Sequence, residues 1–335
     1  MAAQPLNSGG HSCGPAARRG VVLILVLWLL FFLGALAVAA GVYAAAQVEL
    51  ARRMGGRTVA YFVARAGVEQ AKAVVNADSN LWDCLTEPWA GNWADFSDVP
   101  CGAGSFRVWH ISGGDRGAVS TNIGLVDEQR DMDLNQAPRA VVAALFREIG
   151  GVDPGAADSI AQAVEARRSG SPDQGPPAGH AERGWQDIHQ LLSVQGVTPD
   201  VFARVRWFVT VCGDARVNVN TAEYPTLMCV AAAANETAAW QTRDTLARRI
   251  VGFREAGHVF TNRSGYAIVG PLNDWEKLTA EETLLLGQMV PNLGVSSHCF
   301  AGTVTATLQE APAVWRQISF IWDRDTRIIR SWHED

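Results

Sequence analysis

The sequence lacks the short motifs that most often mark a catalytic or cofactor-binding site. It has no His-Glu-x-x-His metal motif, no Gly-x-x-x-x-Gly-Lys phosphate loop and no Gly-x-Gly-x-x-Gly dinucleotide loop. None of its six cysteines stands in a Cys-x-x-Cys pair, so the usual signature of zinc ribbons and thiol redox sites is missing as well. We therefore predict a protein that is not an enzyme and needs no cofactor.

Lysine is nearly absent, with Lys72 and Lys277 as its two occurrences, and the formal net charge of the chain is −6. An acidic protein has no general electrostatic attraction to nucleic acid. The segment VNVNTA, followed by Arg254, Gly257 and Phe260, still resembles helix-hairpin-helix DNA-binding modules. The Gly-apolar-Gly hairpin with which those modules bind phosphate is missing. A membrane-anchored DNA-binding protein of this type is therefore kept as an alternative.

A long stretch without charge lies near the N-terminus. The 26 residues from Val21 to Ala46 contain no charged side chain, and Arg18 and Arg19 precede them. At about 1.5 Å per residue, a helix of this length crosses the roughly 30 Å hydrocarbon layer of a membrane. The apolar core of a secretory signal is shorter, about 7–15 residues. No proline follows before residue 76, so we predict one helix over 21–76 with a transmembrane part at about 21–46.

The middle of the chain, residues 135–292, reads as mainly helical and contains an internal repeat. The segment MDLNQAPRAVVAAL (132–145) aligns with VNVNTAEYPTLMCV (217–230) at an offset of 85 residues. In each copy an apolar-x-apolar triplet precedes an asparagine and a helical stretch. Asn135 and Thr221 are expected to act as helix N-caps, accepting hydrogen bonds from the first turn.

Strand patterns lie on both sides of this helical region. SFRVWHIS and AVSTNIGLV precede it, and TVTATLQ, AVWRQISFIW and TRIIRSW follow it, with DRDT at 323–326 as a hairpin turn. We therefore predict an α+β fold in which a helical region is inserted into a β domain.

Cysteine and acidic residues supply two further candidates. In an oxidising compartment the pairs nearest in sequence are Cys84–Cys101 and Cys212–Cys229, which would leave Cys299 as a buried thiol. Asp131, Asp133 and Asn135 match the first three side-chain ligands of a calcium loop. Gln136 then replaces its glycine and Val142 its glutamate, so a solvated acidic turn is favoured over a calcium site.

Several segments together resemble the minor pseudopilin K family of type II secretion systems. The first is RRGVVLIL, which is similar to a type IV prepilin leader that ends in glycine before a hydrophobic helix. Further segments follow in the family's order: AYFVARAGVEQAKAVV, EQRDMDLNQAPRAVVAAL, WQDIHQLLSVQGVTPDVFARVRWFVTV, DARVNVNTA and RIIRSWHED. Most pilins and pseudopilins carry glutamate at the fifth mature position and the K member does not; here that position is Leu25.

The resemblance implies processing, partners and location. Prepilin peptidase would cut between Gly20 and Val21, with Arg18 and Arg19 in the leader, and the new terminus would be methylated. The protein would cap the pseudopilus with minor pseudopilins I and J and support export across the outer membrane. Other pseudopilins and the inner-membrane assembly platform would be further partners. The chain would cross the inner membrane once, with its body in the periplasm. A minor pilin of a type IV pilus is the closest alternative.

The resemblance also implies a division of the chain. Residues 1–20 would be the leader, 21–76 the long helix, 77–135 a pilin-like β part with a small antiparallel sheet, and 293–335 the strands that complete it. Residues 136–292 would form an inserted all-α domain similar to SAM and helix-hairpin-helix domains.

Overall fold

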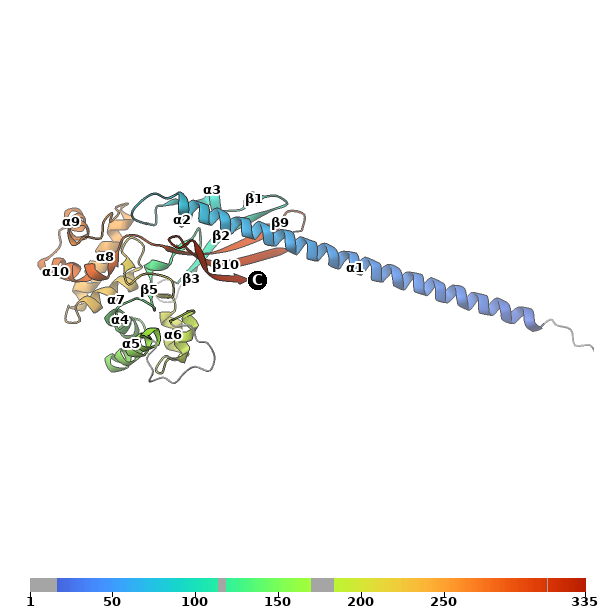
Figure 1. The fold of residues 1–335 in the computed structure, drawn as a ribbon, viewed down its shortest axis with the longest axis horizontal. Helices are drawn as coiled ribbons and strands as arrows, with labels where there is room; N and C mark the ends of the chain where they lie inside the picture. The colour runs from blue at the N-terminus through green and yellow to red at the C-terminus, as the bar shows by residue number, and fades with distance from the viewer. Residues whose placement is uncertain (1–16, 114–118, 170–183, 312) are drawn as a thin grey trace, which may run out of the picture. The chain divides into compact units, whose positions relative to one another are not determined.

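The computed structural model describes residues 17–113, 119–169, 184–311 and 313–335, with side chains from residue 21 onward (Figure 1). The chain divides into two units, Met1–Gly56 and Arg57–Asp335. Most of the predicted leader, including the side chains of Arg18 and Arg19, therefore lies outside the described residues.

Helix α1 (Ala17–Ala77) is 61 residues long and includes the predicted helix 21–76. The sequence is rich in alanine and leucine and free of proline, so every backbone N–H can continue the helical ladder. Within the second unit, one face of this helix is buried at spacings of three to four residues. That face consists of Ala60, Val63, Ala64, Val68, Ala71 and Val75. The amphipathic spacing explains why this end of the helix packs on the sheet.

One seven-stranded antiparallel sheet faces this end of α1. The strand order is β1-β2-β9-β10-β11, with β3 also paired to β2 and β4 to β9. The strands are β1 (Val99–Cys101), β2 (Gly104–Gly113), β3 (Val119–Ile123), β4 (Val126–Asp127), β9 (Cys299–Leu308), β10 (Trp315–Asp323) and β11 (Ile328–Glu334). The predicted strands and the hairpin at 323–326 are confirmed, whereas β1 was not predicted.

The core of this part lies between α1 and one face of the sheet. Phe106, Val108, Val304, Ile318 and Phe320 point to this side, and all five are buried. Their alternation along the strands follows from the two-residue period of β-structure. The residues between them, which are mostly polar, occupy the opposite face.

The helical region has its own core and, in Figure 1, gathers at one end of the sheet. Its helices are α4 (Arg139–Glu148), α5 (Pro154–Ser169), α6 (Pro199–Val205), α7 (Tyr224–Ala234), α8 (Trp240–Glu255), α9 (Gly265–Trp275) and α10 (Ala280–Met289). Two short parallel strand pairs, β5 (Met132–Asp133) with β6 (Val209–Thr210) and β7 (Val217–Asn218) with β8 (Leu293–Gly294), were not predicted.

The chain leaves the sheet for the helical region and returns to the sheet at neighbouring points. Strand β4 pairs antiparallel with β9, and Asp127 lies opposite Phe300. The chain between them, described over residues 128–169 and 184–298, contributes no strand to the seven-stranded sheet in these ranges. A long segment whose two ends lie side by side can be added between two strands without disturbing their pairing.

Candidate assembly helix and domain junction

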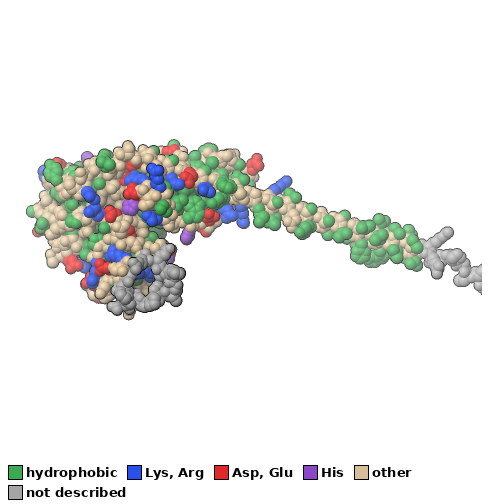
Figure 2. All heavy atoms as spheres, viewed as in Figure 1, with side chains coloured by type: hydrophobic (Ala, Val, Ile, Leu, Met, Phe, Trp, Pro, Cys, Tyr) green, Lys and Arg blue, Asp and Glu red, His purple; other side chains and the backbone are tan. Residues whose placement is uncertain are grey.

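The N-terminal part of α1 presents apolar side chains all round. Every described residue from Val21 to Met54 is exposed, and Figure 2 shows many hydrophobic side chains along the visible face of this segment. Within the described chain it is the one helix that is long and apolar enough to cross a membrane. An apolar surface of this size needs lipid or another protein to cover it. Leu25 lies in this segment and is 64% exposed.

The other end of α1 is fixed to the sheet by a close approach at Gly67. A Cβ atom added to Gly67 would lie 2.6 Å from Cγ1 of Val304 and 2.8 Å from Cδ2 of Phe106. Such distances are shorter than van der Waals contact, so only glycine allows the helix to lie this near the strands. The close packing of this end of the helix on the sheet therefore depends on the absence of a side chain at Gly67.

A buried polar cluster joins the segment that follows α1, the sheet and the helical region. Arg324 donates hydrogen bonds of 3.0 Å to each carboxylate oxygen of Asp83, and the backbone N–H of Ser297 donates to Asp83 at 2.6 Å. Asn218 donates to the backbone oxygen of Asp83 at 3.1 Å and to Asp127 at 3.0 Å. These five residues come from five separate stretches of the chain, so the cluster fixes their relative positions.

Burial in this cluster raises the pKa of both carboxyl groups. The pKa of Asp83 is raised to about 6 because burial outweighs the opposing effect of Arg324. The pKa of Asp127 is also raised by burial, although Ser297, Thr221, Gln129 and Asn218 all hydrogen-bond to it. A buried charged group that loses its hydrogen-bond partner raises the free energy of the folded state. The loss of one partner would therefore destabilise the junction.

The two copies of the internal repeat are held by equivalent asparagines, not by N-caps. Asn135 accepts from the N–H of Trp185 at 2.7 Å and donates to the oxygens of Trp185 and Val211 at 2.9 and 3.1 Å. Asn220 accepts from the N–H of Phe260 at 2.9 Å and donates to the oxygens of Phe260 and Val295 at 2.9 and 3.4 Å.

The predicted N-caps are therefore wrong. Helix α4 has Pro138 and α7 has Glu223 at the N-cap position, and neither makes a side-chain cap bond. The Thr221 hydroxyl instead donates to Asp127. The repeat in the sequence corresponds to a repeat in the structure. The asparagine amides, however, bond to backbone segments far away in the chain, whereas an N-cap bonds to the first turn of the helix that follows it.

The residues that suggested a DNA-binding module belong to this second copy. Arg254 donates to the backbone oxygen of Val219 at 2.8 Å, and Phe260 is fully buried. Gly257 has a φ of +85°, which glycine adopts without strain. Their side chains and backbone are used in packing the helical region.

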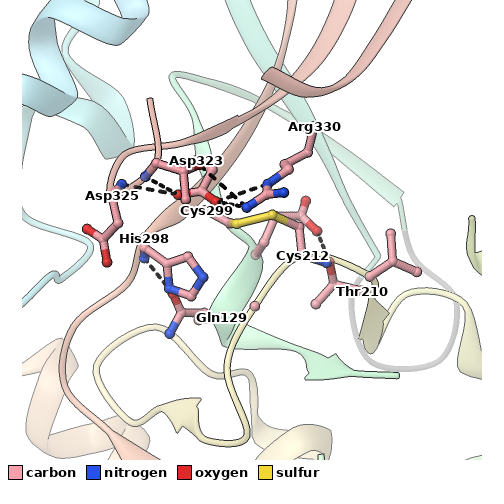
Figure 3. The surroundings of a disulfide bond; sticks show 12 residues. Gln129, Thr210, Cys212, His298, Cys299, Asp323, Asp325 and Arg330 are labelled. Atoms are coloured by element: carbon pink, nitrogen blue, oxygen red, sulfur yellow. Dashed lines mark hydrogen bonds and ion pairs between the residues drawn. A yellow bond between two sulfur atoms is a disulfide. The ribbon is translucent and has the colours of Figure 1, made fainter. Parts of the chain in front are cut away.

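The predicted disulfides are also wrong. Cys212 is bonded to Cys299, 87 residues away, whereas Cys84, Cys101 and Cys229 are free thiols in the described chain (Figure 3). Sequence distance misleads here because the inserted region brings the segment after β6 beside the start of β9. The bond fastens the helical region to the sheet at the point where the chain re-enters it.

The acidic turn before α4 is buried, which corrects the prediction of a solvated turn. The Asp133 residue is 2% exposed, and Asp131 pairs with Arg130 at 3.3 Å. Burial raises the pKa of Asp131 to about 8 and that of Asp133 to about 6. One oxygen of Asp131 has no hydrogen-bond partner, and both carboxyls line a cavity of about 610 Å³.

The calcium triplet does not come together as the calcium-loop pattern requires. The amide oxygen of Asn135 is already occupied by the N–H of Trp185, and one oxygen of Asp133 accepts the N–H of Asn135. Calcium coordination by Asp131, Asp133 and Asn135 stays a prediction, and it would require Asn135 to give up the bonds that hold the repeat.

Comparison with known proteins gives one informative result. No protein-family model and no curated protein matches the sequence. Among solved structures, the chain is similar to a chain of the GspK–GspI–GspJ complex from the type 2 secretion system of enterotoxigenic Escherichia coli. The TM-score is 0.56 at 15% identity, and the match covers 85% of this chain and 96% of the other. The fold of this chain, a long N-terminal helix with an antiparallel sheet and a helical insertion, is therefore GspK-like.

Proposed function

We propose that this chain is a minor pseudopilin of a type II secretion system and lies at the tip of the pseudopilus with minor pseudopilins I and J. The observation that carries the proposal is the GspK-like fold over 85% of the chain, together with the exposed apolar end of α1. The role is one of assembly and not of catalysis.

The exposed helix explains how such a subunit changes environment. In the inner membrane its apolar side chains contact lipid, and in the pseudopilus they contact neighbouring helices. Because both surroundings are apolar, the change is driven by packing between helices and needs no exposure of the helix to water.

Leu25 supports a position at the tip. A carboxylate at the fifth mature position is expensive in an apolar helix bundle unless a neighbouring subunit supplies a positive partner. A terminal subunit has no neighbour above it, so an apolar residue suits it. The charge-free side chain of Leu25 fits this account.

The disulfide supports a periplasmic body. Bonds such as Cys212–Cys299 form and persist in oxidising compartments. With the body on that side, the membrane helix places Arg18 and Arg19 in the cytoplasm, where basic residues next to a membrane helix are favoured. Prepilin peptidase would then cut after Gly20.

The inserted region supplies the cap in this proposal, because its bulk would block the addition of another subunit. The neighbouring positions of Asp127 and Phe300 provide a direct test. Residues 128–298 are replaced by a short glycine-serine turn, and Cys299 by serine so that the loss of Cys212 creates no new unpaired thiol. A cap predicts that this variant still enters the pseudopilus but is no longer confined to its tip.

The partners are tested with the full chain. It is co-expressed with minor pseudopilins I and J of the same secretion system, and the three are purified through a tag on one of them. We expect a single complex that contains all three proteins. If this chain stays behind while I and J purify together, the proposed tip complex is wrong.

A further inference from the structure

The face of the sheet opposite α1 carries polar side chains in cross-strand rows. Ser105 lies opposite Thr307, Arg107 opposite Thr305, and Trp109 opposite Thr303. These residues alternate with the buried ones that face α1, so they point to the other side. The Trp109 indole N–H donates to the Thr305 hydroxyl at 2.9 Å, which fixes the ring along the strands.

A groove of about 800 Å³ runs over this face. Trp93 of the short helix α3 (Trp93–Phe96) and residues of β3 are among those that line it. Trp93 is 69% exposed and Trp109 half-buried, so two indoles line one groove with their rings available. Hydroxyl groups of Ser105, Thr121 and Thr307 line it as well.

The charges in the groove cancel. Arg107 and Asp98 form an ion pair of 2.6 Å, and both line the groove. Asp98 has a φ of 52°, an uncommon conformation for a residue other than glycine, so the backbone holds its carboxylate in place at some cost. A neutral surface with paired charges does not attract a phosphate or a nucleic acid, which need unpaired positive charge.

We propose that this groove binds a neutral polysaccharide, the β-1,4-linked N-acetylhexosamine strand of the cell wall. The apolar C–H faces of sugar rings pack on indoles such as Trp93 and Trp109. The planar carboxylate of Asp98 and guanidinium of Arg107 match pairs of neighbouring hydroxyls, and the hydroxyl groups that line the groove can hydrogen-bond to the acetamido group. The choice of the cell-wall strand rests on the proposed periplasmic location, in which the body stands beside that polymer.

Helix α1 does not cover the groove. The residues of α1 from Arg57 onward pack on the other face of the sheet. A glycan bound in the groove would therefore link the protein to the cell wall without competing with α1 for the sheet.

The test measures binding by the full chain in a detergent without a sugar headgroup, because maltoside detergents would compete. The probe is the β-1,4-linked tetramer of N-acetylglucosamine, and maltotetraose is the comparison sugar. Binding of each sugar is measured by calorimetry and by indole fluorescence. We expect the tetramer to bind and maltotetraose to bind more weakly. Trp93→Ala and Arg107→Ala should each weaken tetramer binding about tenfold, the size of one lost stacking or charge-assisted contact.

The matched control is Trp240→Ala, which removes an indole that is 58% exposed on α8, outside the groove, and should leave binding unchanged. Trp93→Phe keeps an aromatic face and should retain most of the affinity. No binding of the tetramer at millimolar concentration would overturn the proposal, as would equal losses in Trp93→Ala and Trp240→Ala. If Trp93→Ala instead disrupts the complex with pseudopilins I and J, the groove is a protein interface. Glycan binding is measured without those partners, so its failure leaves the proposed tip function untouched.

Discussion

Asn135 and Asn220 hold equivalent places in a repeated unit, and each binds both backbone groups of one residue far away in the chain, Trp185 and Phe260 respectively. Each asparagine also reaches a second carbonyl group, that of Val211 or Val295, beyond a short parallel strand pair. The inserted region therefore consists of two units, each held by the same pattern of asparagine hydrogen bonds.

Substitution of the buried Asn220 by alanine should destabilise the protein by about 2–3 kcal/mol, since it leaves the Phe260 backbone groups without partners. Asn262→Ala is the matched control, because its side chain bonds only at the surface, to the N–H of Ser264. Urea unfolding followed by tryptophan fluorescence measures both. Equal stability of the two variants would mean that the hydrogen bonds of Asn220 do not stabilise the protein.

Two glycines of α1 should respond in opposite ways to alanine. Gly67→Ala should destabilise the protein by about 1–3 kcal/mol, because the new methyl group would collide with Val304 and Phe106. Gly55→Ala meets no atom within 4 Å and should stabilise the helix by up to about 1 kcal/mol. Thermal unfolding in detergent separates the two. A stabilising Gly67→Ala would contradict the close packing of α1 on the sheet.

The cysteines should divide into one disulfide and three thiols in a chain that begins at Val21. Alkylation under denaturing, non-reducing conditions should modify Cys84, Cys101 and Cys229, and peptide mapping should join Cys212 to Cys299. Because the bond closes a loop of 87 residues, Cys212→Ser should cost about 4 kcal/mol of stability. Cys229→Ser removes a buried free thiol and is the control for loss of a cysteine. A Cys212–Cys229 peptide would contradict the structure.

Stability should fall as the pH rises from about 4 to 8. The pKa values of Asp83 and Asp133, about 6, and that of Asp131, about 8, lie above the ordinary value of 3.8. Over this range the folded state holds more protons than the unfolded state, so the free energy of unfolding decreases with pH. Burial lowers the pKa of His110, which opposes the trend near pH 6.

Asp131→Asn isolates the contribution of Asp131. It should reduce the slope of stability against pH between about 6 and 8, because the Asp131 carboxyl, with a pKa of about 8, still holds a proton there in the folded state and not in the unfolded state. Urea unfolding at closely spaced pH values provides the measurement. A wild-type stability that rises steadily to pH 8, or an Asp131→Asn variant with the wild-type slope, would disprove this assignment.

Much of the fold could be predicted from the sequence because its signals are local. Helix α1 follows from a long proline-free stretch, and β2, β3, β9, β10 and β11 follow from alternation and β-branched residues. The repeat at an offset of 85 residues was visible as two matching asparagines. What each asparagine binds was not, because Trp185 and Phe260 have no sequence relation to them.

The junction could not be predicted for the same reason. Asp83, Asn218 and Arg324 look like separate surface residues in the sequence, and only the folded chain brings them together. The Cys212–Cys299 bond likewise depends on how the inserted region returns to β9. The acidic turn was predicted to be solvated because its residues are charged. In the structure the turn is buried, with Asp133 2% exposed, although carboxylates prefer water.

The central claim, that this chain is a pseudopilin, is tested most directly by its N-terminus. The full chain is expressed with and without prepilin peptidase, extracted from membranes, and analysed by intact mass and N-terminal sequencing. The account predicts a start at Val21 with a methylated amino group when the peptidase is present, and retention of the leader when it is absent. A start at Met1 in both cases, or a cut beyond Ala40 that removes the apolar helix, would contradict it.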